Sequence, residues 1–198
     1  MAFRRACSVV AAVFAALVLS GCFVVSKNLP AGTGPINDDR LVGAWQGIDS
    51  DSGEPDDVYL HFQKPEEDKP LRLIWIEDRN YQVYELATMR IGNKNVFAAT
   101  LLTPLEKSRD EIPAGRFLGF YEVNGNGTEV VFHLLDSQKV GELIGRGVVK
   151  GIKPPGKYDF ATLTGSPAEL ARFLASPEAD AARSDEPARL RRLPPVKK

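Results

Sequence analysis

Short segments of alternating apolar and polar residues, separated by turn residues, run from Leu41 to Leu134. In one of them Val58, Leu60 and Phe62 alternate with more polar side chains, which is the pattern of a strand with one buried face. Most of the connections are short, so the strands should form an antiparallel meander that curls or closes to protect its edges. We expect strands over residues 41–48, 58–63, 71–76, 81–91, 96–102, 116–123 and 128–134, with a hairpin turn at 124–127.

Two short helices are expected after these strands. Asp136 can cap a helix that continues to about Ile144. Ser166-Pro167-Ala168-Glu169 combines a serine cap, a proline in the first helical position and a glutamate three residues after the cap. A last strand can lie at 158–163. The sequence therefore predicts a mainly β (α+β) fold: an antiparallel meander of about seven or eight strands, curled or barrel-like, with two short helices near the C-terminus.

The first residues have the layout of a secretory signal. Arg4 and Arg5 give a positive start, and residues 6–19 are apolar except for Cys7 and Ser8. This apolar stretch is too short to cross a bilayer as a stable helix. We therefore exclude it from the folded domain.

The signal ends in Leu19-Ser20-Gly21-Cys22, which resembles the lipobox of bacterial lipoproteins. The resemblance implies that residues 1–21 are cleaved, that the Cys22 sulfur carries diacylglycerol and that the protein is held on a membrane by this lipid. The alternatives are an ordinary signal peptide or an uncleaved anchor, with Cys22 incidental. Phe23 and Val24 stand where inner-membrane lipoproteins commonly carry aspartate, so the family comparison favours the outer membrane, facing the periplasm.

Cysteine and charge counts constrain the exported part. Cys7 and Cys22 are the only cysteines. Cleavage removes the first and lipid occupies the second, so we expect neither a disulfide nor thiol chemistry. Cleavage also removes two of 25 basic residues and none of 26 acidic ones, which changes the formal charge from −1 to −3. A mildly acidic domain gives no indication of nucleic-acid binding.

The expected domain organisation has four parts. Residues 1–21 are the signal peptide, and residues 22–40, rich in Gly, Pro, Asn and Asp, form a lipidated flexible tether. Residues 41–175 form the globular domain. Residues 176–198, rich in Ala, Arg, Asp and Pro, are expected to be a disordered tail. Its last ten residues contain five basic side chains, for which a solubilising role is favoured over contact with an anionic membrane or polymer.

Gly43-Ala44-Trp45 resembles the G-x-W near the start of lipocalins. In that family the tryptophan plugs the closed end of a small barrel, so Gly43 and Trp45 are candidates for a barrel-base signature. The resemblance implies a calyx that holds a small apolar ligand. The alternative is that Trp45 is an ordinary core residue at the start of a strand.

The sequence offers no convincing catalytic, cofactor or metal site. The carboxylates between Asp49 and Asp57 lack the spacing of a calcium loop, so a solvated loop is favoured over a calcium site. His61 and His133 are the only histidines, and no G-x-S-x-G motif accompanies them. Gly141 to Gly147 lacks the lysine and the serine or threonine of a phosphate-binding loop. We therefore expect a protein that is not an enzyme.

Two functions remain open. The first is a non-enzymatic interaction or structural module of the cell envelope that contacts another envelope protein or the wall. The second is a lipocalin-like carrier of a small apolar ligand. The barrel interior discriminates them, because a cavity of about 300 Å³ or more favours a carrier. An interior filled by the large aromatic side chains leaves no such space; these are Trp45, Phe62, Trp75, Phe97 and Phe120.

Overall fold

The computed structural model describes residues 23–34, 36–66, 68–77, 80–102, 114–153 and 160–194. The predicted signal peptide, the predicted lipobox residues Leu19, Ser20 and Gly21, and Cys22 lie outside the described residues. The lipid anchor therefore stays a prediction. No helix in the described ranges is both long and apolar enough to cross a membrane.

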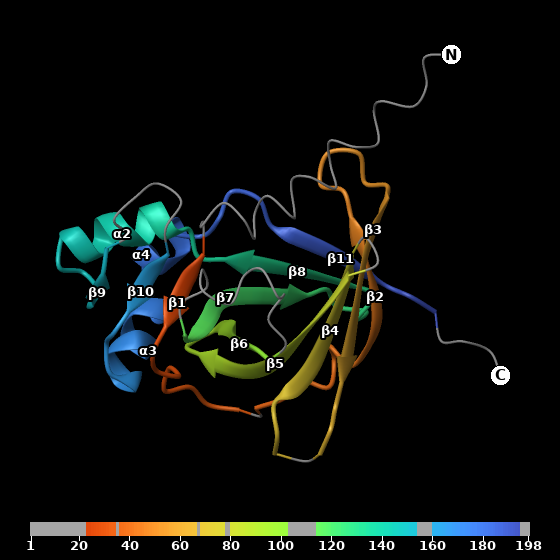
Figure 1. Cartoon of the computed structure of the whole chain (residues 1–198), viewed down its shortest axis with the longest axis horizontal. Coiled ribbons are helices and arrows are strands. Elements are labelled where there is room, and N and C mark those ends of the chain that lie inside the picture. Colours follow the sequence, from red (N-terminus) through yellow and green to blue (C-terminus); the bar gives the residue numbers. More distant parts are fainter. Residues whose placement is uncertain are drawn as a thin grey trace.

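The strands form a closed, eight-stranded antiparallel barrel, which confirms the predicted fold class (Figure 1). Seven consecutive strands make the meander: β2 (Gly43–Ile48), β3 (Pro55–Gln63), β4 (Leu71–Glu77), β5 (Asn80–Ile91), β6 (Lys94–Leu101), β7 (Arg116–Val123) and β8 (Glu129–Leu134). The eighth strand, β11 (Ala188–Arg192), pairs with β8 on one side and β2 on the other. This strand closes the barrel and leaves none of the eight at an open edge.

The expected disorder of residues 176–198 is wrong for the part that is described. Helix α4 (Pro177–Ala181) and strand β11 lie in this segment. Leu190 of β11 lies opposite Gly47 and Val130 and is buried inside the barrel. The strands that pair with β11 are distant in sequence. The sequence of β11 itself, arginines around a single leucine, therefore does not indicate that this segment forms a strand.

The expected tether is also wrong where it is described. Strand β1 (Val24–Ser26) pairs in parallel with β10 (Ala161–Leu163) and antiparallel with the start of β7. Strand β10 pairs in turn with β9 (Gly151–Ile152). Val24 and Val25 are each only 1% exposed. The chain is thus fixed to the fold from Phe23 onward rather than from residue 41.

The described residues contain three short helices, two of them near the C-terminus: α2 (Ser137–Gly145), α3 (Pro167–Ala175) and α4. The predicted caps of α2 and α3 are confirmed. Asp136 accepts a hydrogen bond of 2.8 Å from the Lys139 N–H. Ser166 and Glu169 exchange the two bonds of a capping box, at 2.9 and 3.3 Å.

Two hydrophobic cores share the barrel wall. One lies inside the barrel and includes Trp45, Leu60 and Phe62. The other lies outside, between strands β5 to β7 and the layer of β1, β10 and helices α2 to α4, which gathers on one side of the barrel (Figure 1). Phe120 belongs to this outer core and not to the interior. Both faces of β6 are therefore buried, and an apolar run replaces alternation there.

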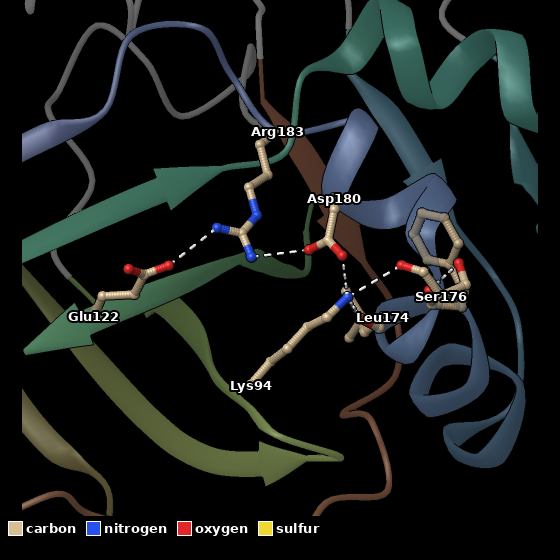
Figure 2. A network of polar contacts seen from close by, with 7 residues as sticks. Lys94, Glu122, Leu174, Ser176, Asp180 and Arg183 are labelled. Atoms are coloured by element: carbon tan, nitrogen blue, oxygen red, sulfur yellow. Dashed lines mark hydrogen bonds and ion pairs between the residues drawn. The ribbon is translucent and has the colours of Figure 1, made fainter.

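A polar network joins the helical layer to the barrel, as Figure 2 shows. The Lys94 ammonium donates to two main-chain oxygens at the end of α3, both at 3.1 Å, and to Asp180 at 2.7 Å. Arg183 contacts Asp180 at 2.9 Å and Glu122 of β7 at 3.3 Å. The network fixes the helical layer beside β6 and β7.

Candidate functional site: a cavity in the barrel

One end of the barrel is closed by Trp45. Its side chain is fully buried, and its indole Nε1–H donates a hydrogen bond of 2.7 Å to the Leu41 carbonyl. The Arg192 guanidinium lies 4.2 Å from the indole ring centre. The same guanidinium donates to the carbonyl oxygens of Val42 at 2.6 Å and Gly127 at 2.8 Å. Arg192 thus connects β11 to the segment that precedes β2 and to the β7–β8 turn.

Gly43 has a geometric role beside this tryptophan. Its φ is +130°, a conformation that residues with a side chain rarely adopt. A Cβ atom there would lie 2.8 Å from a guanidinium nitrogen of Arg192. The structure therefore places Gly43 and Trp45 together at the closed end, with Arg192 packed between them. Sequence analysis missed Arg192 because it lies in the segment expected to be disordered, and no local signal distinguishes it.

Above this end the barrel contains a cavity of about 370 Å³. Its wall is mostly apolar and includes Val58, Leu60, Leu73, Leu86 and Ala99. Polar residues that are exposed or half-exposed gather at the opposite, open end: Asp49, Ser50, Asp51, Asp56, Glu186 and Arg189. We call this group the acidic rim, because it contains four carboxylates and one guanidinium.

Aromatic side chains form the floor of the cavity. The Phe132 ring stacks on Phe62 at 6.0 Å and meets the edge of Phe97 at 5.4 Å. Tyr121 lies deeper and stacks on Phe132 at 5.9 Å. Gly119 leaves space for the Phe97 ring, since a Cβ at Gly119 would lie 2.6 Å from it. These aromatic residues occupy the part of the barrel near its closed end and leave the part near the open end free for the cavity.

Tyr121 is held by hydrogen bonds and an ion pair among residues that do not line the cavity. Its hydroxyl donates to Asp38 at 2.8 Å, and Asp38 forms an ion pair of 2.7 Å with Arg40. Burial and the neighbouring Asp38 charge raise the pKa of Tyr121 above its usual value. Although burial opposes it, hydrogen bonding to Arg40 and Tyr121 holds the pKa of Asp38 below its usual value. Both groups therefore keep their ordinary charge states near neutral pH.

The upper wall has few polar groups. The Tyr84 hydroxyl donates to the Gln82 side-chain oxygen, and burial raises the pKa of Tyr84 to about 12. The Trp75 Nε1–H donates to Glu77 at 3.2 Å. Phe23 also lines the cavity. Such a wall offers apolar contact with a small number of hydrogen-bonding positions.

The carboxylate-rich loop after β2 is held by hydrogen bonds between its own residues. Asp49 accepts bonds of 2.7 Å from both the N–H and the hydroxyl of Ser52, and these bonds lower the pKa of Asp49. In the described ranges no group of three or more His, Cys, Asp and Glu side chains is placed to hold a metal ion. His61 and His133 lie on β3 and β8, outside the cavity lining. Burial and the Arg183 charge lower the pKa of His133.

Comparison with protein-family models, curated proteins and solved structures gives no match to this chain.

Proposed function

We propose that the barrel binds one small apolar ligand and that the chain does so in the cell envelope, held by lipid on Cys22. The cavity of about 370 Å³ is the observation that supports ligand binding. Binding pockets for small molecules occupy about 300–1,000 Å³, and a barrel of eight strands has room for one such ligand. Of the two functions predicted from sequence, this cavity favours the carrier over the structural module.

The polarity of the lining indicates what kind of ligand fits. Apolar side chains surround the middle of the cavity, so the ligand places a hydrocarbon or aromatic part there. Its polar end lies at the acidic rim, where carboxylates outnumber the one guanidinium of Arg189. This excess of negative charge favours a neutral or positively charged end over an anionic one.

The lining supports binding rather than catalysis. In its described part it contains no histidine, cysteine or lysine, and its single serine, Ser50, lies at the exposed rim. An activated nucleophile needs a base within hydrogen-bond reach. We therefore propose a non-enzymatic carrier.

Two neighbouring residues on β6 allow a matched test of the cavity. Ala99 lines the cavity, whereas Thr100 follows it on the outer face and is half-exposed. Ala99→Phe should fill the space and weaken binding of the apolar dye N-phenyl-1-naphthylamine by about tenfold or more, while Thr100→Phe leaves it unchanged. Fluorescence titration measures both. Equal affinities of the two variants would contradict binding inside the barrel.

The envelope anchor has a separate test. Cys22→Ser should abolish incorporation of labelled fatty acid and leave the precursor uncleaved. Mass spectrometry of the native N-terminus should find a lipid-modified Cys22 as the first residue. An unmodified cysteine, or a different first residue, would refute the anchor and leave the ligand proposal standing. Fractionation of membranes tests the proposed outer-membrane location.

A further inference from the structure

Exposed apolar side chains are concentrated on one part of the outer barrel wall. Six large apolar residues are exposed in the described part of the chain, and four of them lie on β3 to β5 or directly after β6: Tyr59, Ile76, Tyr81 and Leu102. Tyr59 pairs with Ile76 across β3 and β4, and Ile76 pairs with Tyr81 across β4 and β5. Leu102 directly follows β6 and donates its N–H to β5 at 2.8 Å. We call these four residues the apolar patch.

The apolar patch borders the open end of the barrel. Ile76 and Tyr81 are one residue from the ends of β4 and β5 that meet at their turn, and Leu102 follows the end of β6 on the same side. Their exposed fractions reach 64% at Tyr81. The acidic rim belongs to the β2–β3 turn and the approach to β11, which lie across the barrel from β5 and β6 in the strand order. The mouth thus has an apolar side and an acidic side.

The chain enters the fold at this same mouth. Phe23 lines the cavity, its ring contacts Phe117 at 5.8 Å, and its backbone bridges to Asp136. Val24 to Ser26 are then fixed between β7 and β10. Adjacent Cα atoms across a trans peptide are about 3.8 Å apart. Lipid on Cys22 would therefore be attached one residue from the cavity wall.

We propose that the open end of the barrel lies against the lipid bilayer, with the apolar patch in the interface, so that the cavity exchanges its ligand directly with that bilayer. The inference rests on the proposed lipid anchor and ligand binding. Tyrosine is favoured at the level of lipid head groups, where its ring and hydroxyl meet different environments. Anionic lipids repel the acidic rim, so the barrel tilts toward its apolar side. The ligand is then a membrane amphiphile whose chain enters the barrel.

Tryptophan fluorescence in vesicles with brominated acyl chains tests this orientation, because bromine quenches nearby indoles. Trp75→Phe removes the tryptophan of the cavity and leaves Trp45, which is buried at the closed end. In that background Tyr81→Trp places a probe on the apolar patch. Gly125→Trp places the matched probe on the exposed β7–β8 turn at the closed end, where an added Cβ meets nothing within 4 Å.

The lipidated proteins are first floated with phosphatidylethanolamine–phosphatidylglycerol vesicles. We expect severalfold stronger quenching in Tyr81→Trp than in Gly125→Trp. Equal quenching in floated protein would overturn the orientation. Failure to float would remove the anchor and the proposal with it, while dye binding by the barrel would be unaffected. If Tyr81→Trp instead changes the oligomeric state without quenching, a second copy covers the patch and the bilayer proposal is wrong.

A linker variant tests the role of Phe23. Twenty Gly and Ser residues inserted between Cys22 and Phe23 span about 25 Å on average and free the mouth from the anchor. The quenching of Tyr81→Trp should then fall toward that of Gly125→Trp. An unchanged difference would show that attachment beside the mouth does not set the orientation. Ala99→Phe should weaken dye binding without changing the quenching, which separates failure of ligand binding from failure of the orientation.

Discussion

Replacement of Arg192 by alanine should destabilise the barrel at its closed end. The change removes a guanidinium 4.2 Å from the Trp45 ring centre and its hydrogen bonds to the carbonyls of Val42 and Gly127. Hydrogen bonds from a charged donor contribute about 1.5–3 kcal/mol each, and a cation–π contact about 0.5–2 kcal/mol. These contributions are not additive, and Arg192 is half-exposed, so water replaces part of what is lost.

We expect the free energy of unfolding to fall by about 3–5 kcal/mol in Arg192→Ala, a large share of the ~5–15 kcal/mol that holds a domain together. At an m-value of ~2 kcal/mol/M in urea, this lowers the unfolding midpoint by about 2 M. Arg192→Lys should lose less, because lysine keeps the charge near Trp45 but lacks the planar fork that reaches three carbonyls, those of Arg40, Val42 and Gly127.

The neighbouring residue provides the control. Arg191 is exposed and makes only a 3.8 Å ion pair with Glu129, so Arg191→Ala should change the stability by about 0.5 kcal/mol or less. Urea titrations followed by tryptophan fluorescence and far-UV circular dichroism measure all three variants. If Arg192→Ala and Arg191→Ala unfold at the same urea concentration, Arg192 does not fix β11 and our account of the closed end fails.

Two further predictions concern the helical layer. Hydrogen bonding to Lys150 and Ser166 lowers the pKa of Glu169 from 4.5 to about 2, so the contribution of Glu169 to stability is present above pH 4.5 and is lost as the pH falls toward 2. The urea midpoint should therefore drop more steeply between pH 4.5 and 2 in wild type than in Glu169→Gln. Parallel pH curves of the two proteins would contradict this prediction. Lys94→Met should cost roughly 2–3 kcal/mol and raise amide hydrogen exchange in α3 and α4 more than in the barrel strands, whereas uniform exchange would refute a local role for the network.

Local sequence patterns predicted the strands and helix starts that depend on near neighbours. Val58, Leu60 and Phe62 were expected on one face of their strand, and all three are buried inside the barrel. The capping residues Asp136 and Ser166 were identified correctly because a cap is recognisable within four residues.

Elements stabilised by distant partners were missed. Strand β11 has one buried apolar residue, Leu190, and acquires its structure from β2 and β8. Val24 and Val25 stand in a Gly- and Pro-rich segment and are buried only because β7 and β10 surround them. The outer core containing Phe120 had a signal that was not used, since apolar residues on both faces of β6 indicate burial on both sides.

The cavity was beyond prediction from sequence, although a calyx was considered. Its volume depends on how the inward side chains share space, as when Gly119 admits the Phe97 ring. A large aromatic count predicts a filled interior equally well. Whether space remains inside the barrel depends further on which aromatic side chains face outward. Phe120 is one that does, because it belongs to the outer core.

Closure of the barrel by a strand this late in the sequence sets an order of events during folding. Until residues 188–192 emerge, β2 and β8 each carry a row of unsatisfied main-chain donors and acceptors, and the meander is an open sheet able to add strands from other chains. Helices α2 to α4 precede β11 in the sequence, so they must already lie beside the barrel before β11 pairs with β2 and β8. Pairing with strands of other chains is therefore most favourable at the stage when β2 and β8 have formed and β11 has yet to pair with them.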